Sequence, residues 1–234
     1  MEKRSLVSFC EKKQLMNSKY VDIQYFGSVE YYLNLINCSY IAFSSSLRYQ
    51  KSVRINRMWL VGPNNPLLLS IPLEGGRNQT RMVREVRIDN SSNWARTHWR
   101  SIHDAYRKAP WFDEYAPGLE ALFQKTEPYL FDFCQRTIVW ACDCLKWRVD
   151  ILSQSDPAAS PVLDRAGSRN PVQQLPDGYP VYSQVFAERH GFIGNLSIID
   201  LILCMGPAAG RYLMQLQQFF KDGQYGIGLL EENT

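Results

Sequence analysis

The stretch that decides the fold is VDIQYFGSVEYYLNLINCSYIAFS, residues 21–44. It opens with VDIQYF, a short strand-like run that stops at Gly27. Ser28 then stands where a helix N-cap is expected, and Glu30 follows in the first turn of that helix. The run YIAFS, residues 40–44, is a second strand candidate. The order strand, helix, strand predicts a βαβ unit with two parallel strands.

The rest of the chain extends this start into an α/β fold with a mixed sheet. MWLVG and LLLSIPL flank the turn residues PNNP and predict a hairpin over residues 58–73, and the alternating run VREVRI predicts a half-exposed strand over residues 83–88. A helical segment follows, with helices expected over residues 94–108, 113–124 and 128–147. The last elements are a strand in VYSQVF, a helix capped by Asn195 or Ser197, and a final helix beginning at AAGRYL.

The domain organisation follows from the polar stretches. Residues 1–19 are charged and polar and form an N-terminal tail. Residues 153–178 are rich in Ser, Pro, Asp and Gly, which indicates a long exposed excursion. We therefore expect one α/β domain over residues 20–234, interrupted by this excursion.

Composition excludes several function classes. The chain has 234 residues and a net charge of only +3, which argues against nucleic-acid binding. Cys142 and Cys144 form a CxC pair without a second pair, so no metal site is predicted, and cysteines among apolar residues are expected to be buried thiols. Reduced cysteines, no convincing signal peptide and no transmembrane segment of roughly 20 apolar residues together predict a cytoplasmic protein.

Sequence motifs for common catalytic and cofactor sites are missing. GNLSIID is not a GxSxG elbow, and EGGRNQT lacks the GxxxxGK[ST] pattern of a phosphate-binding loop. No GxGxxG fingerprint occurs, so the cofactor, if the protein uses one, is unknown.

The helix predicted over residues 94–108 has two distinct faces. One is a solvated basic stripe of Arg96, Arg100, His103 and Arg107. The other holds Trp94, His98, Ile102 and Ala105. A histidine on the apolar face must find a hydrogen-bond partner, and two interpretations stay open. His98 is either a satisfied core histidine or a pocket acid or base that transfers protons.

The segment RYQKSVRINR, residues 48–57, is the most basic in the chain. If it formed a strand, both faces would carry cations, which a half-buried strand avoids. It either lines a cleft, where Arg54 and Arg57 hold a carboxylate or phosphate and Lys51 acts as a point charge, or forms a solvated edge.

The chain resembles the WbqC-like family, and most closely its Bacteroidetes-type branch. The matching pieces lie in the expected order over residues 23–206 and include QYFGSVEYY, YQKSVRINR, PLLLSIPLEGG, VRIDNSSNWARTHWRSIHDAYRKAPWFDEY and YSQVFAERHGFIGNLSIIDLILCMGP. Many members carry QPYFxP near the start, whereas here Gln24 is followed directly by Tyr25, and Gly27 stands where a proline is common. The family name comes from gene clusters for O-antigen and related surface polysaccharides.

The resemblance implies a set of site residues. Its signature positions include Trp99, Lys108 and Pro110, and those carried over as candidate substrate-binding residues are Gln24, Tyr25, Tyr49, Gln50, Lys51, Asn56, Arg57 and Tyr106. Together with His98 they would meet in a cleft at the strand ends. The implied function is an enzyme that modifies a sugar nucleotide or transfers an acyl-type group to an amino sugar. In it Lys51 and Arg57 hold the anionic part and His98 moves a proton. The alternative is a non-catalytic binding or assembly protein of the polysaccharide machinery.

Overall fold

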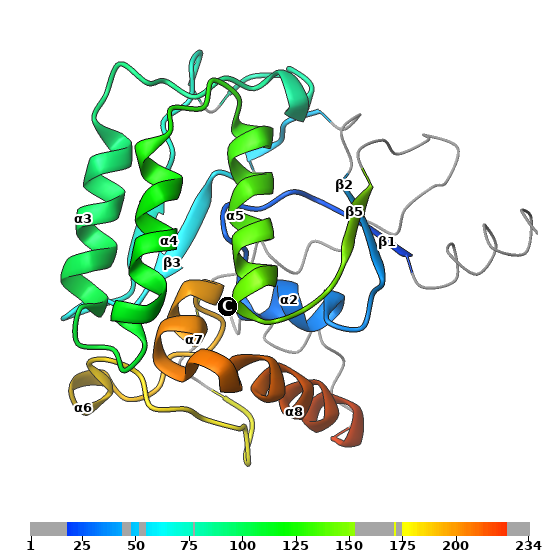
Figure 1. The fold of residues 1–234 in the computed structure, drawn as a ribbon, viewed down its shortest axis with the longest axis vertical. Helices are drawn as coiled ribbons and strands as arrows, with labels where there is room; N and C mark the ends of the chain where they lie inside the picture. The colour runs from blue at the N-terminus through cyan, green and yellow to red at the C-terminus, as the bar shows by residue number, and fades with distance from the viewer. Residues whose placement is uncertain are drawn as a thin grey trace, which may run out of the picture.

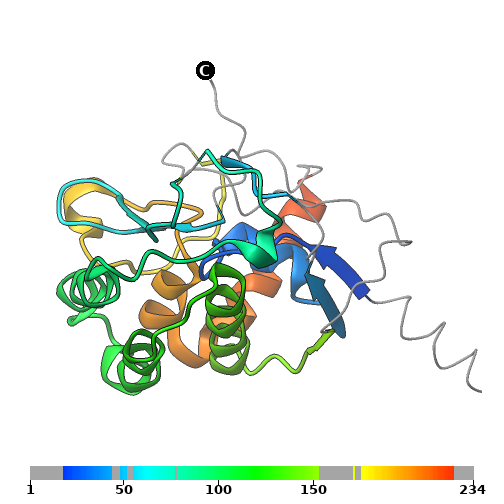
Figure 2. The same ribbon diagram turned by 90° about the horizontal axis from the view of Figure 1, so that it is seen from above.

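The structure is a computed structural model, which describes residues 18–43, 48–51, 55–76, 78–152, 171 and 175–223. Three helices, α3, α4 and α5, stand side by side against two small sheets, and the last helices, α7 and α8, close one end of the molecule (Figure 1). The view from above shows the same separation of the helices from the N-terminal strands (Figure 2). The buried apolar side chains of these elements form one cluster.

The N-terminal βαβ unit is confirmed. It consists of β1 (Ser18–Val21), α2 (Val29–Leu35) and β2 (Tyr40–Phe43). β1 pairs in parallel with β2 from Ser18 opposite Tyr40 to Val21 opposite Phe43, and β5 (Asp150–Leu152) adds in parallel on the other side of β2. The first strand lies earlier than the predicted run VDIQYF, because residues 22–27 turn away from the sheet.

The turn between β1 and α2 depends on a glycine. Gly27 has φ +67°, and a Cβ atom there would lie 2.6 Å from Tyr31 Cδ1. A proline, whose φ is held near −65°, could not take this conformation. Ser28 then caps the helix as predicted, its side chain accepting a hydrogen bond from the backbone N–H of Tyr31 at 3.3 Å.

The predicted hairpin is also present. β3 (Arg57–Leu60) and β4 (Leu67–Ser70) pair antiparallel, with Arg57 opposite Ser70. Met58 and Leu60 are buried while Arg57 is half-buried, so Arg57 lies on the face of β3 that points away from the core.

The strand predicted over residues 83–88 is wrong. Residues Val83–Glu85 form a short 3₁₀ helix, η2, and the flanking residues make isolated bridges: Met82 with Arg48, Arg87 with Tyr129 and Ile88 with Leu73. A Glu85 side-chain oxygen accepts a hydrogen bond from the backbone N–H of Met82 at 3.2 Å. This local bond closes a turn, which alternation of apolar and charged residues alone does not reveal.

The three central helices agree with the prediction within a few residues. They are α3 (Trp94–Tyr106), α4 (Phe112–Gln124) and α5 (Leu130–Cys144). One face of α5, continued by its C-cap Leu145, is buried and includes Phe131, Cys134, Ile138, Ala141 and Cys142.

The C-terminal part contains α6 (Ala187–His190), α7 (Ile198–Met205), η4 (Gly206–Ala208) and α8 (Ala209–Asp222), and Ser197 caps α7 as expected. The strand predicted in VYSQVF is wrong, because side-chain bonds of Gln184 replace strand pairing there. Its Nε2 donates to the Ile193 carbonyl at 2.9 Å, and its Oε1 accepts from the Ile193 N–H at 2.8 Å. The predicted tail up to residue 17 and most of the 153–178 excursion lie outside the described residues.

Candidate functional site

His98 points into the core from α3 and is satisfied by protein groups. Its side chain is 5% exposed, and Nδ1 lies 2.9 Å from the Tyr25 hydroxyl. The ring also hydrogen-bonds the backbone of Ser70 in β4, and the Trp94 ring meets it edge-on at 5.3 Å between centroids. The geometry therefore joins α3, the turn after β1 and the hairpin through one imidazole.

Burial keeps the His98 ring neutral near pH 7. Loss of water around the ring lowers the pKa of His98 to about 4, and the bond to Ser70 opposes that shift only in part. Burial likewise raises the pKa of Tyr25 well above its usual value. Near neutral pH the pair is a neutral imidazole beside a neutral phenol.

Tyr49 and Asn56, two further predicted site residues, form hydrogen bonds beside the β3–β4 hairpin. The Tyr49 hydroxyl donates to Asn56 Oδ1 at 3.4 Å, and Asn56 Nδ2 donates to the Ile71 carbonyl at 2.7 Å. The Tyr25 backbone N–H donates to the carbonyl of Ile55, the residue before Asn56, at 3.0 Å. The structure thus brings Tyr25, Tyr49, Asn56 and His98 into one buried region, where each makes a structural contact.

The remaining predicted polar residues have different surroundings. Gln24 is 1% exposed, and its Nε2 has no hydrogen-bond partner among the described residues. Gln50 and Lys51 are exposed, and Arg57 is half-buried.

Tyr106 belongs to a second buried cluster around Asp200. Its hydroxyl donates to Asp200 Oδ1 at 2.9 Å and accepts from the Val61 N–H at 3.0 Å. Asp200 Oδ2 also accepts from the Tyr182 hydroxyl at 2.5 Å and from Gln184 Nε2 at 2.7 Å. Burial raises the pKa of this carboxyl, and the three hydrogen bonds oppose the rise. The sequence reasoning missed Asp200, although one acid within the apolar run IIDLILCM was a signal for it.

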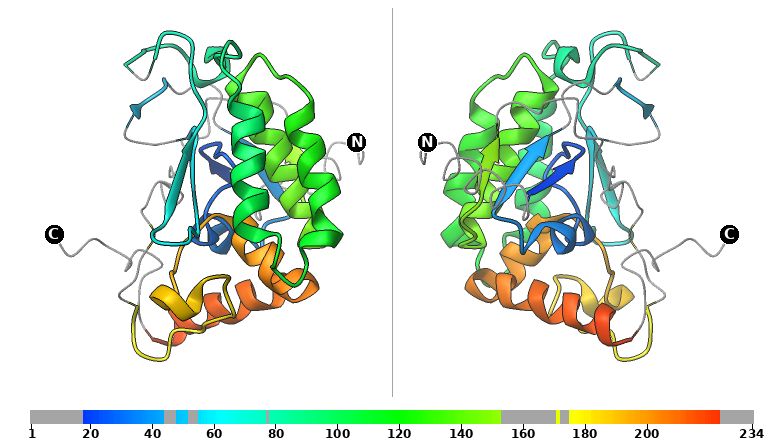
Figure 3. Two further views of the ribbon diagram at one scale, coloured as in Figure 1. Left: turned by 90° about the vertical axis from the view of Figure 1, so that its left-hand side faces the viewer. Right: turned by 90° about the vertical axis from the view of Figure 1, so that its right-hand side faces the viewer.

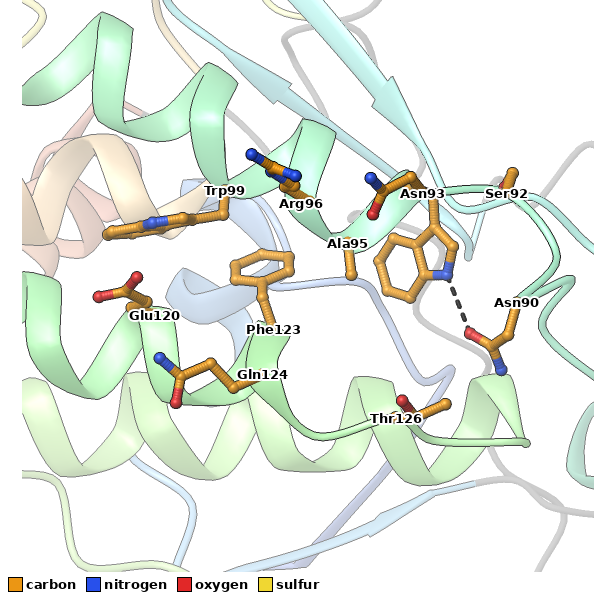
Figure 4. Close-up of a pocket in the computed structure, with 11 residues that line it drawn as sticks. Asn90, Ser92, Asn93, Ala95, Arg96, Trp99, Glu120, Phe123, Gln124 and Thr126 are labelled. Carbon is orange, nitrogen blue, oxygen red and sulfur yellow. Dashed lines mark hydrogen bonds between the residues drawn. The ribbon is translucent and has the colours of Figure 1, made fainter.

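A pocket of about 360 Å³ opens between α3 and α4 (Figure 4). We call it the α3–α4 pocket, and it is lined by Asn90, Ser92, Asn93, Trp94, Ala95, Arg96, Trp99, Glu120, Phe123, Gln124 and Thr126. Trp99 and Glu120 stand at one end, Asn90 and Thr126 at the other, and Phe123 between them (Figure 4). It differs from the predicted cleft at the strand ends, and neither Gln50, Lys51 nor Arg57 lines it.

The lining combines aromatic walls with unused polar groups. Trp94 is fixed by a bond from its Nε1 to Asn90 Oδ1 at 3.1 Å, and its ring meets those of His98, Phe123 and Phe133. Arg96, Glu120 and Gln124 make no side-chain hydrogen bond or ion pair within the described part of the chain. Such free donors and acceptors beside aromatic faces suit a polar ligand that also has an apolar face.

The cysteines of the described ranges are buried thiols. Five cysteines there are free and buried, as expected for structural thiols: Cys38, Cys134, Cys142, Cys144 and Cys204. Burial raises the pKa of Cys142 and of Cys144 to about 12, which keeps both protonated. Across those same residues, no three His, Cys, Asp or Glu side chains gather in a way that could hold a metal ion.

One known protein family matches the chain. A model of the WbqC-like protein family matches residues 24–166. The chain belongs to the WbqC-like family. The matched region of this WbqC-like protein includes both His98 and the whole α3–α4 pocket. Neither a search of curated proteins nor a search of solved structures returned a match. Among the helices of the described residues, none combines the length and apolar composition that a membrane span requires.

Proposed function

We propose that this protein acts in the cytoplasm in the biosynthesis of an O-antigen-like surface polysaccharide and binds an amino sugar or sugar nucleotide in the α3–α4 pocket. The WbqC-like family is associated with genes for such polysaccharides. The observation that carries the proposal is the pocket lining, in which Trp99 and Phe123 stand beside free polar groups of Arg96, Glu120 and Gln124.

Each type of lining residue has a counterpart on a sugar. The apolar face of a pyranose ring packs on aromatic side chains, while its hydroxyl groups need hydrogen-bond partners such as Glu120 and Gln124. The carboxylate of Glu120 also suits the ammonium of an amino sugar, and Arg96 suits a phosphate. The volume of about 360 Å³ is within the usual range for small-molecule sites, about 300–1,000 Å³.

The proposed reaction is modification of a sugar nucleotide or transfer of an acyl-type group to an amino sugar. In this proposal His98 takes up a proton, which its neutral form permits. Arg96 holds the anionic part of the substrate in place of the predicted Lys51 and Arg57, because neither of those lines the pocket. The pocket and His98 share the Trp94 side chain, which contacts both.

The alternative is a non-catalytic binding or assembly protein of the same machinery. The surroundings of His98 favour it, because the ring is 5% exposed and already bonded to Tyr25 and to the backbone of Ser70. In this alternative His98 only supports Trp94, and the pocket binds its sugar without changing it.

Ligand titration tests the binding proposal. Glucosamine, UDP-glucosamine and UDP are added separately, and binding is followed by calorimetry. Either sugar-bearing ligand should bind the unaltered protein, and Trp99→Leu and Glu120→Gln should each weaken binding about tenfold through loss of stacking or of a hydrogen bond. Glu114→Gln, an exposed site on the same helix, is the matched control and should bind normally. Equal weakening in the control, or no binding of the sugar-bearing ligands, contradicts the proposal.

The His98→Gln variant separates the enzyme from the binding protein. Incubation of a sugar-bearing ligand that binds with an acyl donor such as acetyl coenzyme A, followed by mass spectrometry, detects product. Product formed by the unaltered protein and lost in His98→Gln, with sugar binding retained, supports the enzyme. Product formed equally by the variant removes the proton-transfer role of His98.

A further inference from the structure

Two basic segments that are far apart in the sequence lie side by side in the structure. Arg48 forms an antiparallel bridge with Met82, and the Tyr49 N–H donates to the Arg81 carbonyl at 2.8 Å. The Arg48 guanidinium donates to the carbonyl of Thr80 at 3.0 Å. Residues 48–51 and 80–87 therefore form one surface, which we call the basic strip.

The basic strip has a larger net positive charge than the whole chain. It carries five cations, Arg48, Lys51, Arg81, Arg84 and Arg87, and one carboxylate, Glu85, for a net charge of +4. The whole chain has a net charge of only +3, so the remainder carries −1. One neighbouring acid, Glu74, pairs with Arg87 at 3.0 Å.

Exposed apolar groups are interleaved with these cations. Met82 and Tyr129 are each 36% exposed, and both are bridged to an arginine of the strip, Met82 to Arg48 and Tyr129 to Arg87. The Arg87 guanidinium lies over the Tyr129 ring at 5.3 Å. The basic strip thus presents an apolar and an aromatic side chain beside its cations.

This combination matches the chemistry of an anionic bilayer surface. Clustered Lys and Arg are attracted to acidic headgroups, while a neighbouring apolar or aromatic side chain enters the interface. We propose that the basic strip docks this protein on a membrane that carries anionic lipids. The inference is independent of the sugar proposal, because no residue of the strip lines the α3–α4 pocket.

Docking through the basic strip would also set the position of the α3–α4 pocket relative to the membrane. The 3₁₀ helix η2, the beginning of α3 and the end of α4 lie at the same end of the molecule, opposite α8 (Figures 1 and 3). The α3–α4 pocket is formed by the beginning of α3 and the end of α4. Docking through the strip thus brings the pocket close to the bilayer surface, where lipid-linked sugars reside.

Vesicle flotation with the full chain tests this proposal. The unaltered protein should float with vesicles of equal parts phosphatidylcholine and phosphatidylglycerol, not with phosphatidylcholine alone, and added salt should release it. The double variant Lys51→Glu, Arg81→Glu should bind at least about tenfold more weakly. The control Arg107→Glu, Arg148→Glu makes the same change of net charge at two exposed positions outside the strip and should bind normally.

A second pair of variants tests the apolar contribution at constant charge. Met82→Ser should weaken vesicle binding several-fold, whereas Met214→Ser, on the exposed face of α8, should not. No flotation of the unaltered protein, or equal loss in the two charge variants, overturns the proposal. Binding of a labelled RNA duplex that is lost in the Lys51→Glu, Arg81→Glu variant, without vesicle binding, overturns it in favour of nucleic acid.

Discussion

At the residue scale, His98 makes stability depend on pH. Its pKa is about 4 in the folded protein and near 6.5 for the ordinary group. Between these two pH values the His98 ring is protonated in the unfolded chain but neutral in the folded protein. The stability that the neutral ring contributes is therefore complete above about pH 6.5 and is lost as the pH falls toward about 4. At about 1.4 kcal/mol for each unit, the loss approaches 3 kcal/mol.

This loss can be measured by urea unfolding across that pH range. The unaltered protein should lose stability more steeply with acid than His98→Gln, which lacks the titrating ring. His103→Gln changes an exposed histidine of the same helix and should keep the steep dependence. A parallel decline in His98→Gln and the unaltered protein would show that the proton is taken up elsewhere.

At the scale of elements, the turn that joins β1 to α2 depends on Gly27. Alanine at position 27 would be strained by the left-handed backbone, φ +67°, and by the approach of its methyl group to the Tyr31 ring. At Gly75 the backbone is also left-handed, φ +79°, but no atom lies within 4 Å of an added Cβ. We expect Gly27→Ala to lower the free energy of unfolding by about 3 kcal/mol and Gly75→Ala by about 1 kcal/mol. Denaturant unfolding of both variants measures the difference, and equal losses would mean that the Tyr31 ring moves aside freely.

At the scale of the whole molecule, the Asp200 cluster joins the C-terminal part to the earlier elements. Tyr106 in α3 bonds Asp200 in α7 and also accepts from Val61, at the end of β3. Tyr106→Phe removes both bonds and should cost about 2–3 kcal/mol, because two buried polar groups lose a partner. Tyr115→Phe, a half-buried tyrosine of α4, should cost less than about 0.5 kcal/mol. Thermal unfolding that shows similar losses for the two would contradict the joining role of Tyr106.

The same scale shows how much of the site was predictable. Helical spacing was enough to separate the inward His98 from the exposed Arg96 and Arg100, because side chains three or four apart share a face. The partners of His98 were not predictable, since Tyr25 lies 73 residues away in the sequence and Ser70 lies on the hairpin. The α3–α4 pocket was missed for the same reason: it is formed by the beginning of one helix and the end of the next.

By itself, the sequence determined the local elements and their order. Ser28 and Ser197 as caps, the PNNP hairpin turn and the periodic faces of α3 and α5 are short-range features, governed by backbone geometry and spacing along the chain. Tertiary structure alone decided which polar groups are buried together and which cations are neighbours. The strands predicted at 83–88 and in VYSQVF do not form: a 3₁₀ helix with the Glu85 bond stands at the first, and at the second Gln184 bonds the backbone of Ile193. Burial, bridges and pockets depend on contacts between distant segments, which spacing along one segment cannot encode.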